Sequence, residues 1–257
     1  MASNFTSSET GLPSYDEPIR IVPVHSPSLE TAAPTAQLVY NNGPLLTTVE
    51  VYTVFWGSQW QQAPESDLVQ KLNSFFDYIL TSPLLDQMAE YSTAEQKIGR
   101  GSRSGTTTLT TSEPGSNVTD DQIQQFITDA IANSTLPQPT ANTLYFVYLP
   151  SGTTVTMSGD SSCSSFCGYH NAINNKVYYA VMPYPDCAGC TNNLSAFDSL
   201  TSTSSHELCE AITDPVPGQG WYDQANGEIG DICAWQTRQE GNYTIQKEWS
   251  NNSNSCV

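Results

Sequence analysis

The spacing of apolar residues along the chain predicts a series of strands and helices. Residues 48–56 are rich in β-branched and aromatic side chains, which is typical of a buried strand, and Gly57 ends the run. Between Glu65 and Leu80 the apolar residues recur at helical spacing, at Leu68, Leu72, Phe75, Phe76 and Ile79. We therefore expect a strand followed by an amphipathic helix in this part of the chain.

The same patterns predict the remaining elements. They are a short helix from Ser82 to Met88, an edge strand over Thr106–Thr110, a helix from the Thr119–Gln122 capping box to Ala132, strands over Thr143–Leu149 and Lys176–Met182, and a helix over Ser195–Thr213. Strands first alternate with helices and then follow one another, which indicates an α/β domain with a mixed sheet. We expect residues 46–257 to form one such domain. Residues 1–45, rich in Ser, Thr, Pro and Glu without a sustained period, are expected to form an extended arm.

Charge limits the partners that the protein can have. Eight Lys and Arg residues stand against 26 Asp and Glu, for a formal net charge of -18. Nucleic acids and anionic membranes need clustered cations, which this chain does not have. No apolar run approaches the length that spans a bilayer. We expect a soluble monomer with neither nucleic acid nor membrane as a partner.

Cysteines and glycosylation motifs indicate a secreted, extracellular protein. All seven cysteines lie in the C-terminal part, and six Asn-X-Ser/Thr motifs occur, at Asn4, Asn117, Asn133, Asn193, Asn242 and Asn251. The chain begins without an apolar stretch, so we expect a mature form whose signal peptide has been removed.

The cysteine spacing favours disulfides over a zinc ribbon. The cysteines expected in disulfides are Cys163, Cys167, Cys187, Cys190, Cys233 and Cys256. The one CxxC motif is not followed by a second at ribbon spacing. Cys163 and Cys167 share a Ser- and Gly-rich loop that suits a local disulfide, and Cys233 could pair with Cys256. Cys209, inside a predicted helix, is the expected unpaired thiol.

The helix over Ser195–Thr213 carries the most informative chemistry. Its apolar residues share one face, and His206, Glu207, Glu210 and Asp214 lie on the other. His206 and Glu210, at i and i+4, could bind one cation, while Glu207 lies to one side and could act as a general base. This is the arrangement of the HExxH zinc helix with its second His replaced by Glu210. The alternative is a solvated acidic stripe.

Further candidate ligands lie near this helix in the sequence. Asp223, Glu228 and Asp231 follow it closely and are candidates for the third metal ligand, with solvated acids of a turn-rich hairpin as the alternative. His170 is a candidate for a further ligand or a substrate contact, or for a loop histidine packed under a disulfide. His25 has no such context.

Several blocks together resemble the phosphate-induced protein 1, or EXORDIUM-like, family. The blocks are Tyr52–Trp60, Cys167–His170, Tyr184–Cys190, His206–Glu210, Gly220–Tyr222, Glu228–Cys233 and Trp249–Cys256. The resemblance implies an extracellular, cell-wall-associated protein linked to growth and nutrient responses, without a settled activity. The family usually has Ala in place of Cys209, which supports the assignment of Cys209 as unpaired.

The arrangement also resembles the zincin metallopeptidases, in which an edge strand precedes the metal helix. Lys176–Met182 precedes His206 in this way, which implies a zincin-like domain with a disulfide-rich C-terminal part. Our first hypothesis is a secreted zinc metallopeptidase in which Glu207 is the general base and that strand pairs with an extended substrate. The second is a non-catalytic cell-wall or carbohydrate-binding protein, with an acidic site that binds calcium or only shapes a loop. Tyr222 is then a candidate for stacking on sugars.

Overall fold

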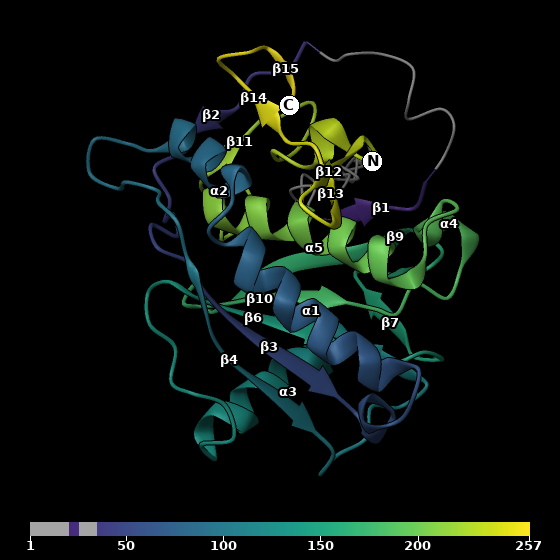
Figure 1. The fold of residues 1–257 in the computed structure, drawn as a ribbon. Helices are drawn as coiled ribbons and strands as arrows, with labels where there is room; N and C mark the ends of the chain where they lie inside the picture. The colour runs from purple at the N-terminus through teal and green to yellow at the C-terminus, as the bar shows by residue number, and fades with distance from the viewer. Residues whose placement is uncertain (1–20, 26–34) are drawn as a thin grey trace, which may run out of the picture.

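A mixed six-stranded sheet runs through the described part of the chain, residues 21–25 and 35–257 of the computed structural model (Figure 1). Its strands in spatial order are β1 (Ile21–Pro23), β9 (Phe166–Ile173), β10 (Val177–Met182), β6 (Thr143–Tyr148), β3 (Glu50–Trp56) and β4 (Ser102–Leu109). Strands β10, β6, β3 and β4 are parallel, whereas β9 runs antiparallel to β10 and β1 antiparallel to β9. The expected mixed α/β architecture is therefore confirmed.

Helices cover both faces of the sheet (Figure 1). The helices are α1 (Glu65–Ile79), α2 (Pro83–Met88), α3 (Asp120–Ala132), α4 (Ala188–Thr191) and α5 (Ala196–Thr213), with 3-10 turns η2 (Ser58–Gln61), η3 (Ala89–Tyr91) and η4 (Asp231–Cys233). Helices α1, α2 and α5 share one hydrophobic core, and α3 packs in the other. Strand β6 is buried on both faces, because alternate residues such as Phe146 and Val147 enter opposite cores.

Local sequence signals explain where two helices begin. The predicted capping box forms at α3, where the Thr119 hydroxyl accepts the Gln122 N–H and the Gln122 side chain accepts the Thr119 N–H. Ser195 caps α5 by accepting the Asp198 N–H. Both caps fix the position of a helix on the sheet.

The edges of the sheet differ from our expectation in one respect. The segment Lys176–Met182 was expected to be an edge strand, but β10 lies between β9 and β6 and is hydrogen-bonded on both sides. It cannot pair with a substrate. Strand β9, Phe166–Ile173, lies between β10 and β1 and was not predicted from the sequence. At the opposite edge β4 contains most of the edge strand expected at Thr106–Thr110.

Short strands extend the fold around the sheet. They are β2 (Val39–Tyr40) with β11 (Trp221–Tyr222), β12 (Thr237–Glu240) with β13 (Tyr243–Gln246), β14 (Trp249–Ser250) with β15 (Ser255–Cys256), and β5 (Asn117–Thr119) with β7 (Thr154–Met157) and β8 (Asp160–Ser161). Within the expected arm of residues 1–45, Leu38 and Leu45 are buried in the main core. Residues 1–20 and 26–34 of that arm lie outside the described residues.

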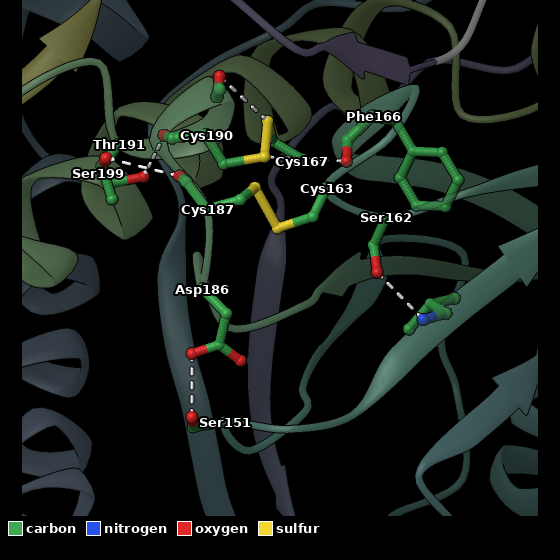
Figure 2. Close-up of a disulfide and its surroundings, with 12 residues drawn as sticks. Ser151, Ser162, Cys163, Phe166, Cys167, Asp186, Cys187, Cys190, Thr191 and Ser199 are labelled. Carbon is green, nitrogen blue, oxygen red and sulfur yellow. Dashed lines mark hydrogen bonds between the residues drawn. A yellow bond between two sulfur atoms is a disulfide. The ribbon is translucent and has the colours of Figure 1, made fainter.

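Three disulfides lie in the C-terminal part. Cys163 pairs with Cys187 and Cys167 with Cys190, so the expected local bond between Cys163 and Cys167 is wrong. The two bonds lie side by side (Figure 2) and tie the beginning of β9 to the segment that precedes α5. The third disulfide, Cys233–Cys256, is the pairing that the sequence suggested. Cys209 is a buried free thiol.

No helix of the described residues is long and apolar enough to cross a membrane.

Candidate metal centre

Helix α5 is buried from Ser199 to Thr213, including the face that carries its acidic residues. Its apolar residues lie in the main core, and β9 and β13 pack against the helix. Small polar residues allow β13 to approach, since Thr201 donates a hydrogen bond to the Thr244 carbonyl and Ser205 accepts the Gln246 N–H. The solvated acidic stripe is therefore wrong, because the C-terminal segments cover this side of the helix.

One group of ligand atoms forms around the first turn of the HExxE motif. His206 Nε2 lies 2.8 Å from Glu210 Oε1 and 3.9 Å from Asp231 Oδ1. The Asp231 N–H donates to the same Glu210 oxygen at 3.1 Å. One ligand atom from each of these residues lies within 4.8 Å of the others, close enough to hold one cation. We call His206, Glu210 and Asp231 the first ligand group.

A second group forms where β9 crosses α5. His170 Nδ1 lies 3.1 Å from Glu207 Oε2 and 3.4 Å from Glu210 Oε2. On the other side of the ring, His170 Nε2 lies 3.1 Å from the Asp214 carbonyl oxygen and 3.5 Å from Glu228 Oε1. His170, Glu210 and Glu228 also place ligand atoms within 4.8 Å of one another. We call these three the second ligand group.

Two glycines allow the backbone to approach the centre closely. A Cβ atom on Gly230 would lie 2.8 Å from the His206 ring, and one on Gly168 would lie 2.6 Å from Thr203 and 3.4 Å from Glu207 Oε1. The distances of 2.6 and 2.8 Å are shorter than ordinary packing contacts, and 3.4 Å is at their lower limit. A side chain at either position would therefore push the neighbouring residues of the centre away. The turn before Gly230 and the strand β9 are therefore both shaped around α5.

Many polar atoms of the centre lack a hydrogen-bond partner among the described residues. The unpartnered atoms are both ring nitrogens of His206, Oε1 of Glu207, Oε2 of Glu210, Oδ1 of Asp231 and both carboxylate oxygens of Glu228 and Glu248. The 2.8 Å contact of His206 with Glu210 is short but poorly aligned for a hydrogen bond. A buried carboxylate without a partner is destabilising by several kcal/mol unless it is protonated or binds a cation.

Burial and mutual contact shift the pKa values within the centre. Burial lowers the pKa of His170, but Glu207 and Glu210 outweigh it and raise the value to about 10. Burial raises the pKa of Glu207 to about 7 despite the hydrogen bond from His170. Burial and neighbouring carboxylates raise the pKa values of Glu228 and Asp231 well above their usual range. Without a bound cation, the centre therefore retains protons at neutral pH.

The structure separates the sequence-predicted candidates into two sets. It brings together His170, His206, Glu207, Glu210, Glu228 and Asp231. Asp223 is elsewhere, where its carboxylate accepts backbone N–H groups from Gln37 and Ala225. Tyr222 lies on β11, paired with Val39, outside both ligand groups. His25 contacts Trp235 edge to face.

Two further acidic residues near the centre, Glu248 and Asp214, were not predicted to take part in it. Glu248, before β14, is fully buried, and His206 and Glu210 are among the charged groups that act on it. Its sequence neighbourhood has no motif that would identify it. Asp214 was placed on the acidic face, and its carboxylate accepts the N–H groups of Gly218 and Gly220. It thereby shapes the turn that brings Glu228 back to the helix.

A polar cavity of about 540 Å³ lies away from these groups, lined by residues that include Asp120, Gln124, Met157 and Asn171. The Asp120 carboxylate there accepts hydrogen bonds from the hydroxyls of Tyr169 and Tyr179. Both of these bonds go to Oδ1, and Oδ2 accepts a hydrogen bond from the Gln124 side chain, so both Asp120 oxygens have partners, unlike several oxygens of the metal centre.

Comparison of the chain with protein-family models and with curated proteins gave no match.

Proposed function

We propose that this protein is a secreted, zinc-dependent hydrolase, most simply a metallopeptidase, whose centre is built on the HExxE helix. The observation that carries this proposal is the first ligand group: three converging, buried ligand atoms, with unpartnered oxygens and nitrogens around them. A divalent cation would satisfy these atoms and replace protons at the centre. The three disulfides, together with the sequence motifs, support an extracellular location.

The donor set fits zinc better than calcium. Zinc binds imidazole nitrogen and carboxylate oxygen together, whereas calcium takes oxygen ligands. Two histidines lie within 4 Å of carboxylates at this centre. When bound, zinc would supply a Lewis acid that polarises a substrate carbonyl.

Glu207 is the residue best placed for a general base. It belongs to neither ligand group, and its Oε1 has no hydrogen-bond partner among the described residues. His170 holds the other oxygen at 3.1 Å. Without a bound cation, burial raises the pKa of Glu207 to about 7, and a cation bound beside it would lower that pKa and keep the carboxylate ionised, able to accept a proton.

An extended peptide could not pair with β10, and it could pair with β9 only by displacing β1. Strand β10 is enclosed by its neighbours, and the outer edge of β9 is paired with β1 of the same chain. The proposal includes the resemblances to zincin metallopeptidases and to EXORDIUM-like proteins. It also includes a peptide or a cell-wall component as the substrate.

The burial of the centre favours a second candidate function, a structural metal site in a non-catalytic extracellular protein. The ligand side chains are at most 6 % exposed. Structural sites are closed in this way, whereas catalytic sites keep a position open to substrate. This candidate predicts metal binding without hydrolysis.

Elemental analysis of the dialysed protein and of His206→Ala tests the metal site. Stoichiometric zinc in the wild type that is lost in the variant supports the proposal. Absence of zinc from wild-type protein that had been loaded with zinc before dialysis would contradict the zinc-dependent hydrolase and leave the non-catalytic protein, whose site binds calcium or no cation. A peptide-library digest, with and without a chelator, then distinguishes the two candidates. Cleavage that the chelator abolishes supports the hydrolase, and metal binding without cleavage supports the structural site.

A further inference from the structure

The two carboxylate oxygens of Glu210 face different partners. Oε1 lies 2.8 Å from His206 Nε2 and accepts the Asp231 N–H at 3.1 Å, within the first ligand group. Oε2 lies 3.4 Å from His170 Nδ1 and makes no hydrogen bond among the described residues. A carboxylate with this arrangement can bridge two cations, one on each oxygen.

One cation on the first ligand group would leave the second group unexplained. Both carboxylate oxygens of Glu228 lack a hydrogen-bond partner in the described structure, and the side chain is fully buried. Its nearest imidazole nitrogen, His170 Nε2, is 3.5 Å away, beyond a good hydrogen bond. A buried carboxyl group in this position must either hold a proton, which the neighbouring Asp214 carboxylate can accept in a hydrogen bond, or bind a cation.

One ring nitrogen of His170 has the carboxylate partner that metal-binding histidines commonly have. Its Nδ1 is 3.1 Å from Glu207 Oε2, so a proton on Nδ1 would be donated to that carboxylate. Metal-binding histidines usually donate their second ring N–H to a carboxylate or carbonyl, which fixes the tautomer and aims the other nitrogen. On the other side of the ring, Nε2 lies 3.1 Å from the Asp214 carbonyl oxygen, so it carries a proton in the metal-free centre, and a cation bound between His170 and Glu228 would displace that proton.

We propose that the centre holds two divalent cations bridged by Glu210, the first on His206 and Asp231 and the second on His170 and Glu228. This inference rests on the metal binding proposed above and extends it from one ion to two. Pairs of ions about 3.5–4 Å apart are a known arrangement in hydrolases, where they stabilise the attacking and leaving groups together. In the competing arrangement a single ion occupies the first ligand group. A protonated His170 then balances the negative charge of the carboxylates in the second ligand group.

Zinc stoichiometry distinguishes these arrangements. Protein loaded with excess zinc and then dialysed is expected to retain about two zinc ions per chain by elemental analysis. Glu228→Gln and Asp231→Asn, which keep the side-chain shape, should each retain about one, and Glu210→Gln should retain little. Asp120→Asn, at a buried acid of the polar cavity, is the matched control and should retain two. Circular dichroism and thermal unfolding show whether each variant folds.

One zinc per wild-type chain, unchanged in Glu228→Gln, would overturn the two-ion proposal while leaving the proposed function intact. No zinc in the wild type would instead contradict the proposed function itself. The wild-type measurement decides the question even where a variant does not fold. Cobalt replacement gives a second readout, because two Co²⁺ ions bridged by Glu210 should couple magnetically, whereas a single ion should give an uncoupled signal.

Discussion

At the scale of single residues, Glu207 differs from the other acids of the metal centre in its surroundings. Its Oε2 accepts a hydrogen bond from His170, while Oε1 has no partner among the described residues and faces the Cα of Gly168. The absence of a side chain at Gly168 leaves the carboxylate next to the backbone of β9.

We expect Glu207→Gln to retain zinc and to lower the rate of peptide hydrolysis by about 10²–10⁴-fold, because an amide cannot accept the proton. Rates on a peptide substrate and zinc content of the same preparation measure both effects. Glu95→Gln, at an exposed glutamate, is the control. Wild-type rates in Glu207→Gln would show that Glu207 is not the base.

The protonation of the centre predicts how the metal-free protein responds to pH. The pKa of Glu207 is raised from 4.5 to about 7 and that of His170 from 6.5 to about 10, so the folded state binds more protons than the unfolded chain. The free energy of unfolding therefore falls as pH rises wherever this difference persists. We expect the melting temperature of chelator-treated protein to fall from pH 5 to pH 8.

Zinc should reverse this trend, because zinc displaces the same protons and binds more tightly as pH rises. Thermal unfolding at several pH values, with and without zinc, measures both curves. A metal-free protein that becomes more stable between pH 5 and pH 8 would show that other groups dominate.

At the scale of elements, α5 was predictable and β9 was not. The periodic apolar residues and the Ser195 cap identify α5, and the i, i+4 spacing of His206 and Glu210 follows from it. The sequence of β9 contains Gly168 and Asn171, which disfavour a strand, and contacts with segments distant in the sequence, β10, β1 and α5, stabilise it. For this reason His170 could be listed as a candidate, but its position opposite Glu207 could not be derived.

Strand β1 covers the edge of β9 that an extended substrate would need. Val22 pairs with Gly168, Val24 N–H donates to the Ser165 carbonyl, and the Pro23 carbonyl accepts the Trp235 indole N–H. Strand β1 also lies next to α5 and to η4, which carries Asp231. The chain thus occupies the position proposed for its own substrate.

We expect removal of residues 1–25 to increase hydrolysis of extended peptides several-fold, because the edge of β9 becomes free. The loss of the buried Val22 side chain should lower the free energy of unfolding by about 2 kcal/mol. Peptide hydrolysis and urea unfolding measure the two effects. The same truncation with His206→Ala should remain inactive. If the truncated protein keeps its zinc but gains no activity, β1 protects the edge without controlling access.

At the scale of the whole molecule, the C-terminal segments enclose the centre and depend on it. The Cys233–Cys256 disulfide joins η4 to β15, and the Trp249 N–H donates to the Ile229 carbonyl, next to Glu228. These segments cover the helix face for which the sequence left a solvated acidic stripe as the alternative to a metal site. Periodicity identified the charged face but could not identify what packs on it, because those contacts join residues far apart in the chain.

This arrangement makes the stability of the whole molecule sensitive to the cation. Binding to the folded state alone adds about 4 kcal/mol at a free zinc concentration 1,000 times the dissociation constant. For a chain of this size that corresponds to a rise in melting temperature of roughly 8–16 °C. We expect zinc to produce such a rise in the wild type and little or none in His206→Ala, measured by calorimetry after chelation. An equal rise in both proteins would place the stabilising zinc elsewhere, and exposed acids would then be responsible. A rise confined to the wild type would show that the buried acids of α5 and the C-terminal segments act as one cation-dependent unit.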